Sequence, residues 1–141
     1  MLNRLVTLFA GCVGTPQHPL GSLEDRAYVL KAAGIDTLVF DASVFDAHAA
    51  KLKELVPALQ HLLAFGPTEC GEDYLALATT FEPKPLVAPD VLPDDVSSVN
   101  FTGGTTGKPK GVMSTHRGNG LYDPDTNDGM GIPRRGMHSD G

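Results

Sequence analysis

Residues 101–112 read Phe101-Thr-Gly-Gly-Thr-Thr-Gly-Lys-Pro-Lys-Gly-Val112, and this stretch predicts a strand that runs into a glycine-rich loop. The run from Val96 to Phe101 is apolar and β-branched enough to form a strand, and Val112 to His116 predicts a second strand leaving the loop. Glycine lets the backbone approach a ligand without a Cβ in the way, and successive backbone N–H groups form an anion-binding nest. The loop is therefore the part of the chain that carries a specific chemical signal.

The other residue types in this loop point to a ligand that carries several phosphate groups. Threonine hydroxyls donate hydrogen bonds to phosphate oxygens, and lysine ammonium groups supply positive charge. Pro109 stiffens the basic end of the loop and lowers the entropy lost on binding. The candidate phosphate-binding residues are Thr102, Gly103, Gly104, Thr105, Thr106, Gly107, Lys108 and Lys110. The alternative that the residues leave open is a flexible hairpin that is merely hydrophilic.

Two other phosphate-binding patterns are excluded. The Walker A pattern requires glycine where Thr102 stands and serine or threonine where Pro109 stands. The dinucleotide fingerprint Gly-x-Gly-x-x-Gly does not occur anywhere in the chain. The loop therefore needs another explanation.

Upstream of the loop, strand and helix patterns alternate, which favours an α/β fold with a mostly parallel sheet and flanking helices. The predicted strands are 5–13, 35–40 and 62–65, and the predicted helices are 23–33, 46–55 and 74–79. Ser22, with Asp25 three residues later, predicts the start of the first helix, and Gly34 predicts its end. The prolines from Pro83 to Pro93 predict an extended connector.

The composition changes at residue 118. Residues 118–141 contain six glycines and two prolines and no valine, phenylalanine or alanine. Such a segment buries too little apolar surface to offset its ordering entropy, so we expect it to be disordered. The sequence thus predicts a domain at 1–117 and a glycine-rich tail at 118–141.

Length and charge exclude several classes of function. A chain of 141 residues is one domain or part of one. Its net charge of −6 argues against general binding to nucleic acid or to an anionic membrane. No apolar run approaches the ~18 residues of a transmembrane helix. Two cysteines, Cys12 and Cys70, make no disulfide framework, so a reducing cytoplasm is expected.

The remaining polar and aromatic residues are expected to be structural. The histidines have no metal-ligand spacing, so no metal site is predicted at His18, His48, His61 or His138. The acidic pairs predict solvated faces or helix caps; they are Glu24-Asp25, Glu72-Asp73 and Asp94-Asp95. Packing roles are expected for Tyr28, Tyr74 and Phe81, and a structural role for His116.

Residues 101–112, closed by Thr115-His116, resemble the phosphate-loop signature of the adenylate-forming (AMP-binding) enzymes. This superfamily includes acyl-CoA ligases, luciferases and peptide-synthetase adenylation domains. The upstream stretches Gly11-Cys-Val-Gly-Thr-Pro16 and His18-Pro-Leu-Gly-Ser22 also resemble it, and the likeness covers residues 5–117. Within the superfamily the chain most resembles bacterial fatty-acid–CoA ligases. It departs from the pattern at Gly103, where serine is more usual.

The resemblance implies the large N-terminal domain of such an enzyme and its two-step reaction. ATP and a carboxylate give an acyl-adenylate and pyrophosphate, and the CoA thiol then displaces AMP. The loop would hold the β- and γ-phosphates, with Mg²⁺ sharing their charge. ATP, Mg²⁺ and CoA are thus the implied cofactors, and a fatty acid or another carboxylate is the implied substrate. No residue is assigned a catalytic role.

The family's adenine and acyl pockets, acidic magnesium ligand and C-terminal lid follow the phosphate loop, and only 30 residues follow Gly111 here. We therefore expect a truncated ligase remnant that is inactive alone; the change of character after Arg117 suggests a frameshift or a gene remnant as the hypothesis for its origin. One alternative is a non-catalytic phosphate-binding or complementation module, which acts with a partner chain or self-associates through open sheet edges. Another is a lipoprotein anchored at Cys12, because Phe9-Ala10-Gly11-Cys12 resembles a processing site.

Overall fold

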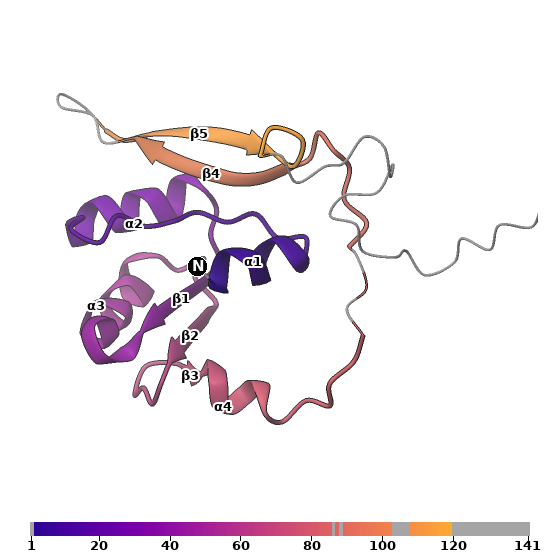
Figure 1. The fold of residues 1–141 in the computed structure, drawn as a ribbon. Helices are drawn as coiled ribbons and strands as arrows, with labels where there is room; N and C mark the ends of the chain where they lie inside the picture. The colour runs from indigo at the N-terminus through magenta and orange to yellow at the C-terminus, as the bar shows by residue number, and fades with distance from the viewer. Residues whose placement is uncertain (1, 86, 88, 103–107, 120–141) are drawn as a thin grey trace, which may run out of the picture. The chain divides into compact units, whose positions relative to one another are not determined.

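The structure, a computed structural model of the chain, describes residues 2–85, 87, 89–102 and 108–119. These residues divide into two compact units (Figure 1). The first unit contains residues up to Pro16, the connector from Lys84 onward, and the strands on either side of the glycine-rich loop. The second unit contains residues 17–83 together with Lys108 and Pro109.

The second unit is an α/β arrangement around a parallel sheet. Its elements are α2 (Leu23–Ala32), β1 (Thr37–Asp41), α3 (Ala42–Leu55), β2 (His61–Phe65), β3 (Glu72–Asp73) and α4 (Tyr74–Ala78). The strands lie in the order β1-β2-β3, and β1 pairs with β2 from Thr37 opposite His61 to Asp41 opposite Phe65. The predicted α/β class with a parallel sheet and flanking helices is therefore confirmed. The short β3 was not predicted.

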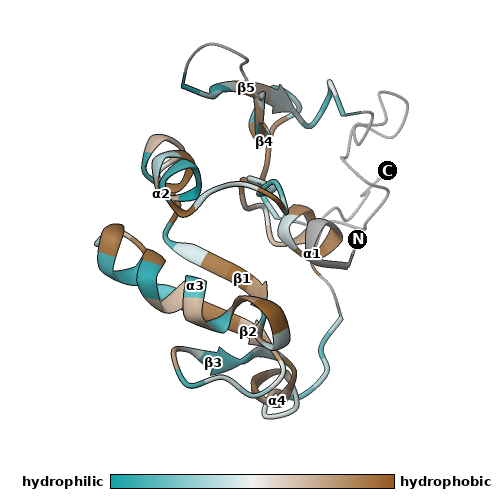
Figure 2. Cartoon of the chain, turned by 90° about the vertical axis from the view of Figure 1, so that its left-hand side faces the viewer, coloured by the Kyte–Doolittle hydropathy of each residue, from teal (hydrophilic) through white to brown (hydrophobic). Residues whose placement is uncertain are grey.

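The core of the second unit lies between the sheet and its helices. Alternate residues of β1 and β2 are buried, and α3 packs on both strands while α2 packs on α3. Figure 2 shows the apolar colouring along β1 and β2 and polar stretches on the outer sides of α2 and α3. The buried cluster comprises Ala27, Leu30, Leu38, Phe40, Ala49, Leu52, Val56, Leu59, Leu62 and Ala64. Burial of this apolar surface is the main force that holds the unit together.

Helix α2 begins and ends where the sequence predicts. The Ser22 hydroxyl oxygen accepts a hydrogen bond from the backbone N–H of Asp25 at 3.1 Å and donates one to the Asp25 carboxylate at 2.9 Å. At the other end Gly34 adopts a positive φ of 64°. Its N–H donates to the Lys31 carbonyl, and the Ile35 N–H donates to the Leu30 carbonyl. These two bonds form a Schellman motif, which satisfies carbonyls that the helix end leaves unpaired.

The cap of α2 gives a first prediction. Replacing Ser22 with alanine removes the acceptor for the Asp25 N–H, so the free energy of unfolding should fall by about 1 kcal/mol. Urea unfolding followed by circular dichroism measures the change. Ser22→Thr keeps the hydroxyl and should stay close to the wild type. Equal stability of Ser22→Ala and the wild type would show that the cap contributes nothing.

Helix α3 starts four residues earlier than its predicted beginning at Asp46. The residue that caps it is Asp41, at the end of β1. The Asp41 carboxylate accepts hydrogen bonds from the Ser43 N–H at 2.9 Å and from the Ser43 hydroxyl at 2.6 Å. These bonds lower the pKa of Asp41, because they favour the charged carboxylate. The predicted end before Pro57 is confirmed at Leu55.

The strand predicted at residues 5–13 is wrong, because Leu2–Phe9 form helix α1 in the first unit. The apolar residues Leu5, Leu8 and Phe9 recur at helical spacing, and only Leu8 of these is buried. Gly11 has a φ of 68° and ends the helix in a second Schellman motif. Its N–H donates to the Leu8 carbonyl, and the Cys12 N–H donates to the Thr7 carbonyl. Gly11 was the sequence signal for a helix end.

The first unit also contains the antiparallel hairpin of β4 (Val96–Thr102) and β5 (Lys110–Thr115). Both strands were predicted, and they pair with each other. Gly14 adds a short parallel bridge to Ser98, in which the Gly14 N–H donates to the Ser97 carbonyl at 3.0 Å. No helix or strand occurs among the described residues from 80 to 95, in keeping with the predicted extended connector.

The residues that follow β5 are hydrogen bonded within the first unit. The His116 N–H donates to the Asp95 carbonyl, and the Arg117 guanidinium pairs with the Asp94 carboxylate at 3.0 Å. The Asn119 amide donates to the buried Ser97 hydroxyl at 2.7 Å. The rest of the predicted disordered tail, residues 120–141, lies outside the described residues.

Candidate functional site

The two strands of the hairpin bring the ends of the candidate phosphate loop together. Thr102 and Lys110 are register partners, and the Thr102 hydroxyl donates to the Lys110 carbonyl at 3.4 Å. Both residues are exposed, as is Lys108. The other predicted site residues, Gly103, Gly104, Thr105, Thr106 and Gly107, lie outside the described residues. The site assignment for the whole loop stays a prediction.

Gly111 is the second residue of β5 and lies opposite Phe101 of β4. A Cβ at this position would lie 3.0 Å from Val99 Cγ1 and 3.1 Å from Phe101 Cζ. Such distances are tighter than most real Cβ contacts, so a side chain at position 111 would require the Val99 and Phe101 side chains to shift. Gly111 therefore leaves room for these two side chains beside the end of the loop.

Lys108 lies over an aromatic ring of helix α2. Its Nζ atom is 5.5 Å from the centroid of the Tyr28 ring, within the range of a cation–π interaction. The sequence predicted only a packing role for Tyr28. No local pattern indicates this contact, because the two residues are far apart in the chain and meet through tertiary structure.

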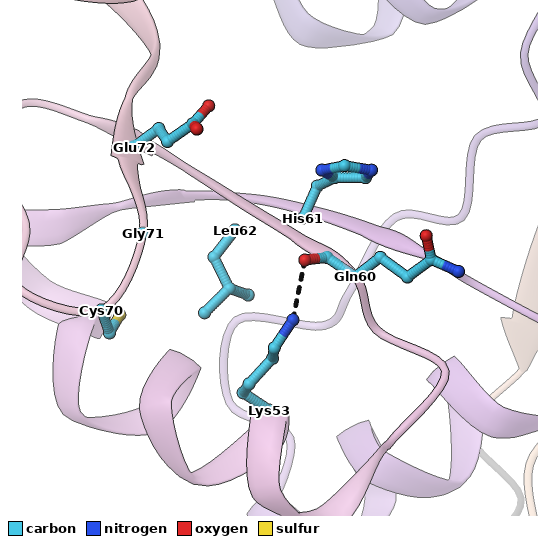
Figure 3. A pocket seen from close by; sticks show the side chains of 7 residues that line it. All are labelled: Lys53, Gln60, His61, Leu62, Cys70, Gly71 and Glu72. Carbon is cyan, nitrogen blue, oxygen red and sulfur yellow. Dashed lines mark hydrogen bonds between the residues drawn. The ribbon is translucent and has the colours of Figure 1, made fainter.

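A small hollow lies at the sheet end near α3 (Figure 3). It measures about 140 Å³, less than the ~300–1,000 Å³ typical of ligand pockets. Its lining residues are Lys53, Gln60, His61, Leu62, Cys70, Gly71 and Glu72. The Lys53 ammonium donates to the Leu59 carbonyl at 2.6 Å and to the Gln60 carbonyl at 2.7 Å. This lysine therefore fastens the turn after α3 and is not a candidate for binding phosphate.

A polar cluster joins α3 to the segment after β2. The Asp46 carboxylate accepts hydrogen bonds from the Thr68 hydroxyl and from the Cys70 thiol, the latter at 3.3 Å. The bond from Thr68 is the main cause of a lowered pKa at Asp46. Burial is the main cause of a raised pKa at Cys70, and the nearby Asp46 charge adds to it. Cys70 is therefore a protonated thiol at neutral pH and a poor nucleophile.

The lowered pKa of Asp46 predicts a loss of stability in acid. The unfolded chain binds this proton at a higher pH than the folded chain does. The contribution is therefore complete above the ordinary value of 3.8 and is lost as the pH falls through the lowered value. Urea midpoints measured from pH 3 to pH 7 should fall in acid for the wild type and less steeply for Asp46→Asn. Glu54→Gln, an exposed change on α3, is the control, and parallel slopes for all three would contradict the prediction.

The packing roles predicted for Tyr74 and Phe81 have different outcomes. Tyr74 packs edge-on against Phe65, with ring centroids 5.5 Å apart, as expected. The packing role predicted for Phe81 is wrong, because the side chain is 69% exposed. Phe81 follows the short helix α4. Among the acidic pairs, Asp73 caps α4 by accepting from the N–H groups of Leu75 and Ala76.

Among the described residues, no cluster of three or more histidine, cysteine, aspartate or glutamate side chains could hold a metal ion. Both cysteines are free thiols. No helix in the described part of the chain combines the length and the apolar character needed to cross a bilayer.

Comparison with known proteins identifies the family. The model of the family described as AMP-binding enzyme matches residues 5–124. The chain therefore belongs to the AMP-binding enzyme family, as its phosphate-loop stretch suggested. The match runs past residue 117, and the division into a domain at 1–117 and a tail at 118–141 stays a prediction.

The curated relatives are CoA ligases. The chain is 48% identical over 107 residues to the medium/long-chain-fatty-acid–CoA ligase FadD8 of Mycobacterium tuberculosis, a match that covers 72% of this chain and 19% of that protein. It is 31% identical to the crotonobetaine/carnitine–CoA ligase of Salmonella arizonae, covering 75% of this chain and 21% of that one. The chain thus spans about a fifth of the length of the curated relatives that it matches.

Solved structures show the same relationship. The amide bond synthetase McbA of Marinactinospora thermotolerans matches with a TM-score of 0.66 and 35% identity, covering 79% of this chain and 22% of that one. The apo structure of MbtA from Mycobacterium smegmatis matches with a TM-score of 0.69 and 26% identity, covering 82% and 21%. The α/β architecture described above is therefore that of adenylate-forming enzymes.

Proposed function

We propose that this chain carries the triphosphate-binding loop of a ligase that activates a fatty acid or another carboxylate with ATP and passes the acyl group to CoA. The observation that carries this proposal is a hairpin that pairs Thr102 with Lys110 around a glycine–threonine loop, in a chain 48% identical to a fatty-acid–CoA ligase over 107 residues. The cytoplasm, where two free thiols would stay reduced, is the compartment that we propose.

The proposed binding residues are those of the loop, and their chemistry suits phosphate oxygens. They are Thr102, Gly103, Gly104, Thr105, Thr106, Gly107, Lys108 and Lys110. The Thr102 hydroxyl is exposed at the end of β4 and can turn to donate to a phosphate oxygen. The ammonium groups of Lys108 and Lys110 neutralise part of the triphosphate charge, and backbone N–H groups of the loop complete the cradle.

Magnesium fits this site as a companion of the triphosphate. The loop contains hydroxyl and ammonium groups and no carboxylate, so its donor set is suited to phosphate and not to a bare divalent cation. When bound, Mg²⁺ shares the negative charge of the β- and γ-phosphates. The role of this chain is to bind and orient those phosphates. We propose that the acyl and CoA steps need residues beyond it, so the chain alone gives no turnover.

Phosphate binding by the loop is directly testable. Replacing both Lys108 and Lys110 with glutamine removes two charged contacts, and the dissociation constant for magnesium pyrophosphate should rise roughly 10- to 100-fold, about 1.4 kcal/mol for each tenfold step. Isothermal titration calorimetry measures it. Lys51→Gln, an exposed change on α3, should bind like the wild type. An unchanged dissociation constant in the double variant would refute the assignment.

A second candidate function is a complementation module that pairs with another chain. The observation that favours it is a pair of exposed apolar side chains on β5, Val112 at 53% and Met113 at 70% exposure, one on each face of the hairpin. A hairpin of two strands is marginally stable alone and leaves ladder groups open to pairing.

Self-association through β5 can be tested separately. Changing Val112 and Met113 to threonine keeps β-compatible residues and removes apolar area, so the self-association constant should fall at least several-fold. Sedimentation velocity across protein concentrations measures it. Leu20→Thr, at an exposed position in the second unit, is the matched control. A wild-type chain that stays monomeric at every concentration would remove this candidate.

A further inference from the structure

We infer that the Lys108 ammonium binds to the ring of Tyr28 through a cation–π contact, which we call the dock. A phosphate group must break this contact in order to bind the ammonium. Tyr28 is thus a positioning residue that acts through Lys108. The dock itself stands on the contact between the two side chains. Its displacement by phosphate rests on the proposed function of the loop.

The position of the Tyr28 ring is determined by its helix. Tyr28 lies on α2 between Ala27 and Val29, which are both buried in the second unit. The helix is fastened at both ends, by the Ser22 cap and by the Gly34 turn. Tyr28 itself is half-buried, so one part of the ring is packed and another part faces the solvent. The helix therefore holds the Tyr28 backbone at a defined position beside the buried core.

Lys108 lies close enough to the Tyr28 ring to interact with it. Its Nζ atom lies 5.5 Å from the ring centroid, and the residue belongs to the same compact unit as α2. The following residue, Pro109, is half-buried and has a restricted φ, which limits where the Lys108 backbone can go. The negative face of the aromatic ring attracts the ammonium group, which keeps part of its hydration shell at this distance.

Phosphate and the ring compete for the same ammonium group. A hydrogen bond from an ammonium to an anionic phosphate oxygen is stronger than contact with a neutral ring, so phosphate wins when it is present. Leaving the ring still has a free-energy cost, and this lowers the affinity of the loop. Removal of the ring should therefore tighten phosphate binding by about 2- to 5-fold, the factor that corresponds to an exposed cation–π contact.

The dock can be tested in the wild-type chain without any ligand. In the protein labelled with ¹³C-lysine, the ε-protons of Lys108 should shift upfield and show nuclear Overhauser contacts to the Tyr28 ring. Lys108→Ala assigns the signal. Tyr28→Phe keeps the ring and should keep the shift, whereas Tyr28→Leu should abolish it. In a second sample labelled with ¹³C-arginine, the Arg26 side chain, whose guanidinium lies 4.6 Å from the Phe45 ring centroid, is the control and should keep its shifts in both Tyr28 variants.

A titration with magnesium pyrophosphate then tests the dock and the proposed function independently of each other. Titration should return the Lys108 signals to the positions of a solvent-exposed lysine, and Tyr28→Leu should bind 2- to 5-fold more tightly than the wild type and Tyr28→Phe. Absent ring contacts in the free wild type would overturn the dock, whatever the chain binds. Ring contacts that persist under saturating pyrophosphate would overturn displacement. Ring contacts in a chain that binds no pyrophosphate would leave the dock established and refute the proposed function. If Tyr28→Leu binds pyrophosphate no more tightly than the wild type does, the ring and the phosphate do not compete for the Lys108 ammonium.

Discussion

Replacing Gly71 with alanine is expected to lower the free energy of unfolding of the second unit by about 3 kcal/mol. A Cβ at position 71 would lie 2.7 Å from Leu62 Cβ and 2.9 Å from the Leu62 carbonyl carbon. Real Cβ atoms essentially never approach other heavy atoms so closely, and the obstacle is partly backbone, which cannot rotate away. Leu62 is a buried residue of β2, so relief of the clash would disturb the sheet.

The control for this prediction is Gly34→Ala. Gly34 has a φ of 64°, and no atom lies within 4 Å of a Cβ placed there. Alanine at this position suffers only the strain of a left-handed backbone, roughly 1–2 kcal/mol. Urea unfolding of both variants, followed by far-ultraviolet circular dichroism, separates steric exclusion from backbone strain. If Gly71→Ala proves no less stable than Gly34→Ala, segment 70–73 can move away from β2, and the contact with Leu62 does not require glycine.

Truncation of Leu52 is the other large effect, with an expected loss of roughly 2–5 kcal/mol on change to alanine. Leu52 is 1% exposed and lies on the face of α3 that packs against β1 and β2. The change removes buried apolar atoms and leaves a cavity that close-packed neighbours fill only in part. Since small domains have little stability to lose, the variant should be largely unfolded near room temperature.

Leu55→Ala is the matched control on the same helix. Leu55 is 44% exposed, so its truncation removes less buried surface and should lower the free energy of unfolding by about 1 kcal/mol or less. Both variants keep the helix propensity of α3 nearly constant, because alanine and leucine are both strong helix formers. The difference in stability between Leu52→Ala and Leu55→Ala, measured by thermal and urea unfolding, therefore reports the burial of the two side chains. Similar losses for the two leucines would indicate that α3 does not pack on the sheet as described.

Several local features of the fold could be predicted because their physical causes lie within a few residues. The cap at Ser22 and the stop at Gly34 depend on side chains and backbone angles next to the helix ends. The strand at 62–65 follows from a short apolar run that is followed by turn residues. The apolar run at 5–13 misled the prediction, because a short run does not distinguish strand from helix and the stop at Gly11 was included in the predicted strand.

The start of α3 shows a different limit of prediction from the sequence. Asp41 ends β1 and caps α3 at once, so strand and helix adjoin without a loop residue between them. Sequence reasoning began the helix at Asp46, where the apolar spacing becomes clear. The structure gives Asp46 another role, as the acceptor for Thr68 and Cys70. Those partners are remote in the chain, and nothing near Asp46 indicates them.

The sequence by itself determined the α/β class, the glycine–threonine–lysine loop and the family, because these depend on residue types at fixed short spacing. Only the tertiary structure decided that the strands beside the loop pair with each other and that Lys108 lies over Tyr28. It also decided that Leu62 and Gly71 meet so closely that glycine is required. The contact of Lys108 with Tyr28 joins residues far apart in the chain, and all three contacts depend on how the elements pair and pack. Local patterns carry no information on that packing.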